Sequence, residues 1–396
     1  MIEPNDFVLN TPTRSHRMLS VQMPVMGFVA DLMMENPGTL SLGQGVVHYP
    51  PPLSALESAH EAFTSQEIHR YGFVLGRRDL RDTFAQKLSD ENQLDSGYEV
   101  VVTAGSNMAF FASLLAITSP GDEVILLVPY YFNHEMATRI AGCTPVLVSL
   151  GESLMPDVDA IKHAITPKTR AIVTISPNNP TGIVYSADTL RAINQLCGEH
   201  SIYHMSDEAY EYFTFDGAKH YSPGSARDAH AHTISLFSMS KAYGMAGWRL
   251  GYMAVPPHIL ADIRKIQDTN QICPALPSQA VALSAMSLGS IYCKQYMRSM
   301  AEVREIVLQY LRKIKAPIKI SPSEGAFYFF LSVDTHLDAK TLTKRLIEEH
   351  KVAVIPGDTF GMEEGIYLRI AYGALQRDTL EEPLNRLSAG LAALTG

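Results

Sequence analysis

The chain has 396 residues, of which 46% are hydrophobic and 18% are charged, and its formal net charge at pH 7 is −9. This composition suits a large folded core and argues against disorder. The negative balance argues against a general nucleic-acid surface, because binding to phosphates needs clustered Lys and Arg. The four cysteines lie far apart without a C-x-x-C pair, so we expect neither a disulfide framework nor a metal site.

The first ten residues, MIEPNDFVLN, lack a basic segment followed by an apolar run, so no secretory signal is predicted. Apolar stretches such as VILLVPYYF are about half as long as a membrane helix requires. We therefore expect a cytoplasmic protein without a membrane partner.

Short β-rich runs alternate with longer helical patterns through the middle of the chain. One helix is predicted over 186–200, with Ser186 or Asp188 as its cap. Strand–helix alternation is typical of βαβ units and a mostly parallel sheet flanked by helices. The runs cover residues 99–105, 123–129, 144–150, 169–176, 201–209, 232–238 and 251–256.

The pattern changes after about residue 285. A helical stretch over about 286–314 leads into β-rich and helical runs that read as a smaller α/β domain with a meander-like sheet. The segment before residue 48 is expected to pack with this part. The α/β prediction therefore has a large domain over 48–285 and a small domain over 1–47 plus 286–396.

Lys241 follows the strand run HTISLFS, where a lysine is unexpected because it is costly to bury. An arbitrary lysine is most often a solvated loop residue. Small neighbours leave space here for a bulky ligand, and ligands of parallel sheets bind beyond the carboxyl ends of the strands. A desolvated lysine near other cations has a lowered pKa, so its amine can attack a carbonyl group.

Other polar motifs also follow strands. Asp207 and Tyr210 in SDEAY read either as an ordinary helix start or as partners of a heteroaromatic ring. Asn179 in SPNNPTG lies in what could be a simple turn. Gly105, before Ser106 and the start of a helix, suits a phosphate site as well as ordinary capping. The G-x-G of GQGVVH lacks a third glycine and a strand–helix context, so a dinucleotide site is discounted.

The motifs NPTG, DEAY and SMSKAYGMAGWRLGY, in this order and spacing, resemble those of fold-type I pyridoxal-phosphate enzymes of the class I/II aminotransferase family. The resemblance extends from SLGQG to YLRIAYG, nearly the whole length. It implies the PLP-transferase fold, pyridoxal 5'-phosphate as cofactor, amino-acid and 2-oxo-acid substrates, and a homodimer with shared sites.

The resemblance also implies roles for individual residues. Lys241 would form the Schiff base, and Asp207, supported by His134, would pair with the pyridine nitrogen. Arg369 in YLRIAYG would bind the substrate α-carboxylate bidentately. Asn179 would also contact the substrate, and the backbone of Gly45 would lie beside its carboxylate. The remaining cofactor contacts would come from Gly105, Ser106, Asn107, Tyr131, Asn179, Tyr210, Ser238 and Arg249, with Tyr71 reaching the neighbouring subunit's phosphate.

The substrate is less constrained. The segment 267–279 contains no Lys or Arg that could bind a side-chain carboxylate, so a neutral or aromatic donor is favoured and aspartate stays possible. LGQG and CPALPSQ resemble a kynurenine/glutamine-type branch, whereas the lysine motif resembles bacterial aspartate- and aromatic-type members. Tyr49, Phe73 and Tyr131 could line an apolar pocket or belong to the core. Alternatives are a carbon–sulfur β-lyase or related synthase, and a non-catalytic regulatory protein with this fold.

Overall fold

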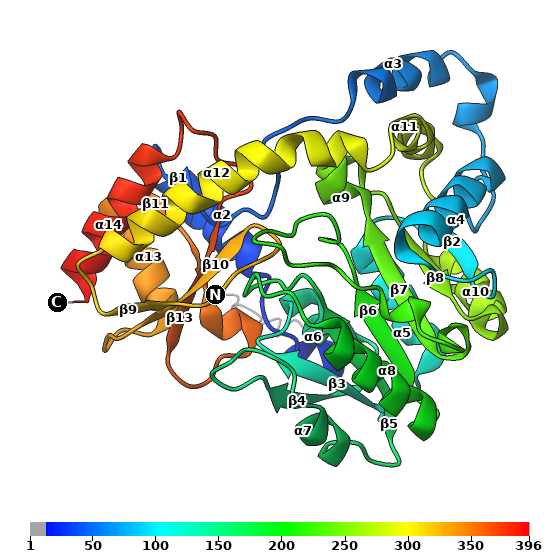
Figure 1. Ribbon diagram of the computed structural model, residues 1–396, viewed down its shortest axis with the longest axis horizontal. Helices are drawn as coiled ribbons and strands as arrows, with labels where there is room; N and C mark the ends of the chain where they lie inside the picture. The colour runs from blue at the N-terminus through cyan, green and yellow to red at the C-terminus, as the bar shows by residue number, and fades with distance from the viewer. Residues whose placement is uncertain (1–12, 396) are drawn as a thin grey trace, which may run out of the picture.

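The computed structural model describes residues 13–395, and in this range the main sheet has seven strands in the order β2-β8-β7-β6-β5-β3-β4 (Figure 1). Only the pairs β2–β8 and β7–β8 are antiparallel, so the predicted α/β fold with a mostly parallel sheet is confirmed. The strands are β2 (Glu99–Thr103), β3 (Glu123–Val128), β4 (Thr144–Ser149), β5 (Thr169–Ile175), β6 (Tyr203–Asp207), β7 (Thr233–Ser238) and β8 (Gly251–Val255).

Alternate side chains of these strands enter different hydrophobic layers, because successive side chains point to opposite faces of a sheet. Leu126 of β3 packs in the layer that contains residues of α5, α6 and α10. Its neighbours Ile125 and Leu127 pack in the layer that contains residues of α7 and α8. The helices are α3 (Leu53–Ala62), α4 (Arg78–Asn92), α5 (Ser106–Ile117), α6 (Phe132–Ile140), α7 (Val158–His163), α8 (Ala187–His200), α9 (Met239–Ala242), α10 (Leu260–Gln271) and α11 (Leu276–Met286).

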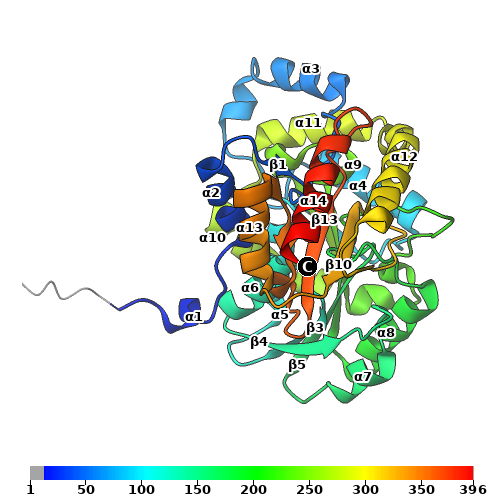
Figure 2. The same cartoon turned by 90° about the vertical axis from the view of Figure 1, so that its left-hand side faces the viewer.

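A second, four-stranded antiparallel sheet has the order β12-β13-β10-β9. Figure 2 shows α13 and α14 beside this sheet, and these two helices contact each other. The elements are β9 (Ile318–Ile320), β10 (Tyr328–Val333), α13 (Ala339–His350), β11 (Val352–Ala353), β12 (Ile355–Pro356), β13 (Ile366–Ala371) and α14 (Glu381–Leu394).

The N-terminal segment packs with this second part, as expected. β1 (Leu40–Ser41) pairs in parallel with β11, and α2 (Val25–Glu35) contacts α13; a short α1 (His16–Leu19) precedes them. The predicted domain boundaries stay predictions. Residues 1–12, which include the segment in which no secretory signal is predicted, lie outside the described residues.

Two local expectations can be compared with the structure. Helix α8 begins after Ser186, whose side chain accepts a hydrogen bond from the N–H of Thr189 at 3.1 Å, so Ser186 is the cap of the two candidates. The helical stretch predicted over 286–314 is wrong at its start, because α11 ends at Met286 and α12 (Ile291–Lys313) begins only after a turn. Gly289 in that turn has a φ of +58°, which interrupts the helix.

Among residues 13–395, we find no helix that combines the length and the hydropathy of a membrane span. The cytoplasmic location stays a prediction.

Candidate active site

A cavity of about 180 Å³ lies at the carboxyl ends of β5, β6 and β7. It brings together most of the residues that the sequence predicted for the site, although they come from six separate segments of the chain. This is the edge at which ligands of open α/β sheets bind. The lining residues are Ser106, Asn107, Tyr131, Ile175, Asn179, Asp207, Ala209, Tyr210, Ser238, Ser240, Lys241 and Arg249.

Lys241 is held on the short helix α9, directly after β7. The side chain of Ser238 caps this helix by accepting a hydrogen bond from the N–H of Ser240 at 3.2 Å. The amine of Lys241 donates a hydrogen bond to the carbonyl oxygen of Gly45. Burial, together with the guanidinium groups of Arg369 and Arg249, lowers the pKa of Lys241 to about 8, although Asp207 opposes the shift. The amine is therefore prepared to act as a nucleophile near neutral pH.

The lowered pKa predicts a pH-dependent reactivity of Lys241. About one amine in ten is neutral at pH 7, against fewer than about one in a thousand for an ordinary lysine. Acylation of the cofactor-free protein at Lys241, followed by peptide mapping, should rise about tenfold per unit below pH 8 and level off above pH 9. The exposed Lys265 is the internal control, and the labelling profile of Lys241 should lie at lower pH than that of Lys265. A shared profile for the two lysines would contradict the assignment.

Asp207 ends β6 and points into the cavity, and its carboxylate is buried. Its Oδ1 accepts a hydrogen bond from the N–H of Ala209 at 3.1 Å, and its Oδ2 lies 3.1 Å from Nε2 of His134. The ring of His134 stacks on Phe110 at 4.0 Å between centroids. Asp207 thus has the histidine partner that the sequence predicted.

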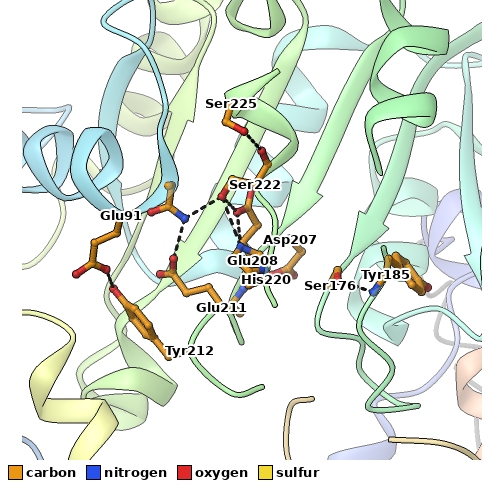
Figure 3. A network of polar contacts seen from close by, with 12 residues as sticks. Glu91, Ser176, Tyr185, Asp207, Glu208, Glu211, Tyr212, His220, Ser222 and Ser225 are labelled. Atoms are coloured by element: carbon orange, nitrogen blue, oxygen red, sulfur yellow. Dashed lines mark hydrogen bonds and ion pairs between the residues drawn. The ribbon is translucent and has the colours of Figure 1, made fainter. Parts of the chain in front are cut away.

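The next residue, Glu208, turns to a different polar network (Figure 3). Its Oε2 accepts a hydrogen bond from Ser222 and lies 2.9 Å from Nε2 of His220. Asn92 connects Ser222 to Glu211 through contacts of 2.8 and 2.9 Å. A buried network with many partners can stabilise the loop after β6, and thereby the strand end that carries Asp207.

Arg249, Ser106 and Asn107 line the end of the cavity at the start of α5, and Gly105 directly precedes this helix. Gly105 has a φ of +82°, and a Cβ placed on it would lie 2.5 Å from Nη2 of Arg249. Ser106 and Asn107 begin the helix, where backbone N–H groups lack intrahelical acceptors and the helix dipole is positive. This arrangement of an exposed guanidinium and a helix start fits a phosphate group.

Two hydrogen bonds connect Arg369, Asn179 and Tyr210 in another part of the site. Nη1 of Arg369 donates to Oδ1 of Asn179 at 2.8 Å, and Nδ2 of Asn179 donates to the hydroxyl of Tyr210 at 3.5 Å. Burial raises the pKa of Tyr210 well above its usual value, so the phenol is a neutral donor. Arg369 does not line the cavity itself but is buried against it.

Two residues of the site were missed by the sequence reasoning. The hydroxyl of Tyr328 lies 2.7 Å from that of Tyr210, yet Tyr328 lies in the apolar run GAFYFFLSV, which reads only as a buried strand. The carbonyl oxygen of Gly43 accepts a hydrogen bond from Nη2 of Arg369 at 2.6 Å. A backbone contact of this kind carries no side-chain signal.

The three residues that were considered for an apolar pocket, Tyr49, Phe73 and Tyr131, lie in different places in the structure. Tyr131 lines the cavity, whereas Tyr49 lies in the core, stacked on Tyr296 at 3.9 Å. Phe73 is exposed and so is Tyr71, with 81% of its surface accessible. Both line a separate hollow of about 740 Å³ and do not contribute to the cavity of their own chain.

Comparison with known proteins identifies the family. Residues 37–387 match the family described as aminotransferase class I and II. An aromatic aminotransferase of Arabidopsis thaliana is 35% identical over 96% of both chains, and an aspartate aminotransferase of Pyrococcus abyssi is 34% identical over 88% of this chain and 90% of its own.

Solved structures agree with this result. An aromatic aminotransferase from Pyrococcus horikoshii superposes with a TM-score of 0.84 and 33% identity, covering 92% of this chain and 99% of its own. Aspartate aminotransferase from Thermus thermophilus with maleate gives a TM-score of 0.87 at 30% identity, over 96% and 100% of the two chains. The chain belongs to the class I and II aminotransferase family and is an enzyme with aminotransferase activity.

Proposed function

We propose that the protein binds pyridoxal 5'-phosphate and moves the amino group of a neutral or aromatic L-amino acid to a 2-oxo acid such as 2-oxoglutarate. One observation carries the proposal. The amine of Lys241, with a pKa of about 8, enters a single cavity together with the carboxylate of Asp207 and the guanidinium of Arg249. These three groups match an aldehyde, a ring nitrogen that has to stay protonated, and a phosphate.

The residues present fit this cofactor. Arg249 and the first turn of α5 would hold the phosphate, and the absence of a side chain at Gly105 leaves the guanidinium room to approach. Asp207 would keep the pyridine nitrogen protonated, while Tyr210 and Asn179 would donate hydrogen bonds to the phenolic oxygen. When bound, the cofactor accepts the electron pair released at the substrate Cα.

The protein's own groups would perform the proton transfer and hold the substrate. Nζ of Lys241 would take up the proton from the substrate Cα as a base and would return it as an acid, because its amine enters the cavity. Arg369 would bind the α-carboxylate, since its planar guanidinium has the geometry of bidentate pairing. The buried surroundings of Arg369 strengthen that interaction by excluding water.

The distribution of charge supports a neutral donor. Lys241 and Arg249, the two cations that line the cavity, have roles toward the cofactor, and Arg369 has one toward the α-carboxylate. None of these three is left to bind a carboxylate on the donor's side chain. Phe360 and Tyr328 lie 5.3 and 4.5 Å from the guanidinium of Arg369, so its surroundings are aromatic. Both aromatic and aspartate aminotransferases occur among the relatives, so their names do not decide between the donors.

A homodimer with shared sites forms part of the proposal. Tyr71 is exposed and lies outside the cavity of its own chain. Arg249 and Asn107, at the phosphate end of the cavity, are exposed as well. A second subunit that places its Tyr71 at this end would complete the polar contacts there. Sedimentation at micromolar concentration should give twice the chain mass of 43.6 kDa.

A reduction experiment and a donor panel test the activity. The protein loaded with pyridoxal phosphate should show a visible absorption band, and borohydride should abolish it and attach the cofactor to the peptide that contains Lys241. With 2-oxoglutarate as acceptor, phenylalanine and other neutral donors should form glutamate faster than aspartate does. Release of pyruvate and ammonia from cystathionine as the main reaction would indicate a β-lyase instead. Activity confined to aspartate and glutamate would contradict the donor class.

Replacement of Gly105 by alanine should weaken cofactor binding about tenfold or more. The new methyl group would strain a backbone with φ of +82° and would displace the guanidinium of Arg249. The dissociation constant of pyridoxal phosphate, measured by equilibrium dialysis, checks the prediction. Gly247→Ala is the matched control, because no atom lies within 4 Å of its added Cβ, and its affinity should match the wild type. Equal affinities of all three proteins would exclude the proposed phosphate site.

A further inference from the structure

Tyr328 stands at the junction of the two sheets. It begins β10, directly after a segment whose backbone is bonded to the large-sheet side of the molecule. The N–H of Ala326 donates to the carbonyl of Phe213 at 2.9 Å, and that of Gly325 donates to Gly182 at 2.7 Å. A Cβ on Gly182 would lie 2.7 Å from the carbonyl oxygen of Tyr328, so the two segments pack in direct contact. The backbone that carries Tyr328 is therefore held by these loops on one side and by the pairing of β10 with β13 on the other.

The Tyr328 side chain touches two groups with different roles. Its hydroxyl lies 2.7 Å from that of Tyr210, and its ring lies 4.5 Å from the guanidinium carbon of Arg369. Arg369 also donates a hydrogen bond to Asn179, which donates one to Tyr210. Tyr328, Tyr210, Asn179 and Arg369 therefore form a closed cycle of contacts. Tyr328 is fully buried, and water does not compete for these contacts.

The number of hydroxyl hydrogens decides which of the two tyrosines, Tyr210 or Tyr328, donates the hydrogen bond between them. A phenol has one hydrogen to donate. If Tyr210 gives its hydrogen to the phenolic oxygen of the cofactor, the bond between the two tyrosines has to be donated by Tyr328. Accepting a hydrogen bond makes a hydroxyl a stronger donor, so Tyr328 strengthens the bond that Tyr210 makes.

The aromatic ring of Tyr328 contacts the guanidinium of Arg369 and restricts its orientation. The Nε of Arg369 is buried and has no hydrogen-bond partner among the described residues. An aromatic face beside a guanidinium attracts the cation and restricts its orientation. The ring contact therefore complements the bonds to Asn179 and Gly43 and holds the guanidinium in place.

We propose that Tyr328 is a positioning residue with two separable actions: its hydroxyl directs the Tyr210 phenol toward the cofactor, and its ring orients Arg369 for the substrate carboxylate. The inference rests on the proposed function and adds a residue to it. Because the Tyr328 side chain contacts both Tyr210 and Arg369, it connects the cofactor site with the carboxylate site.

Tyr328→Phe tests the first action, because it removes the hydroxyl and keeps the ring. The readout is the pH midpoint of the visible absorption change of the protein loaded with pyridoxal phosphate. A weaker bond from Tyr210 leaves the phenolic oxygen more basic, so the midpoint should rise by about 0.3–0.5 unit. In a Tyr210→Phe background the same substitution should cause no further shift, since the effect passes through Tyr210.

Tyr328→Leu tests the second action by removing the ring. The KM for amino-acid donors should rise about five- to tenfold in Tyr328→Leu and stay unchanged in Tyr328→Phe. Tyr98→Phe is the control: its hydroxyl donates to the carbonyl of Gly224 at 3.0 Å, and Tyr98 precedes β2, at the edge of the sheet opposite the cavity. Neither the midpoint nor KM should change in this variant.

The outcomes separate the inference from the function on which it rests. A wild-type protein that gives no visible band with pyridoxal phosphate would contradict both. A wild-type band with the same midpoint in Tyr328→Phe would overturn the role of the hydroxyl and leave the function intact. An equal shift in the Tyr210→Phe background would show that the hydroxyl does not act through Tyr210, and would overturn the inference in the same way.

Discussion

Lys241→Ala should lower the transamination rate by at least about 10⁴-fold, because one substitution removes both the nucleophile and the proton-transfer group. The cavity should still accept pyridoxal phosphate, because Arg249 and Asp207 remain. Borohydride should then attach no cofactor to the protein. Stopped-flow absorbance with phenylalanine and 2-oxoglutarate measures the rate, and mass spectrometry measures attachment.

Two further variants isolate the amine. Lys241→Arg keeps a cation of similar length that does not release its proton near neutral pH, so it should be as inactive as Lys241→Ala. Lys265→Ala removes a lysine that is 76% exposed on α10, and its rate should equal that of the wild type. Full turnover in either Lys241 variant would exclude the lysine from the reaction and with it the proposed function.

The amino-acid sequence is sufficient to predict the large sheet and most of the cavity, for a physical reason. Each strand is a short apolar run, and each motif residue lies at or just after the end of its strand, as Asp207 does at the end of β6 and Lys241 after β7. Parallel strands bring their carboxyl ends to one edge, so motifs that are far apart in the chain can be assigned to one site.

The sequence did not predict the parts of Tyr328 and Gly43 in the site, because they depend on contacts between segments that are distant in the chain. Tyr328 lies within an apolar strand, and only the packing of β10 against the loop after β6 brings its hydroxyl to Tyr210. Gly43 takes part through its backbone, for which the amino-acid type gives no signal. Tyr49 and Phe73 differ for the same reason: the core covers Tyr49 and leaves Phe73 exposed, and the neighbouring residues in the sequence do not reveal this.

Arg369→Lys should lower kcat/KM for amino-acid donors by about 10²-fold. The guanidinium makes two separate hydrogen bonds, to Asn179 at 2.8 Å and to Gly43 at 2.6 Å, and these fix the fork that would meet the α-carboxylate. An ammonium group cannot reproduce paired parallel bonds, and each charge-assisted bond contributes about 1.5–3 kcal/mol. Steady-state kinetics with phenylalanine provides the measurement.

The choice of donor separates this role from a general loss of stability. Phenylalaninamide lacks the carboxylate, so its much lower kcat/KM should change only a few-fold in Arg369→Lys. Arg304→Lys is the matched control: this buried arginine bonds Asp216 and the carbonyl of Ser323, and none of these three residues lines the cavity. It should lower Tm without altering the ratio between acid and amide. If acid and amide lost the same factor in Arg369→Lys, the guanidinium would support the fold only, because a carboxylate contact is the one interaction that the two donors do not share.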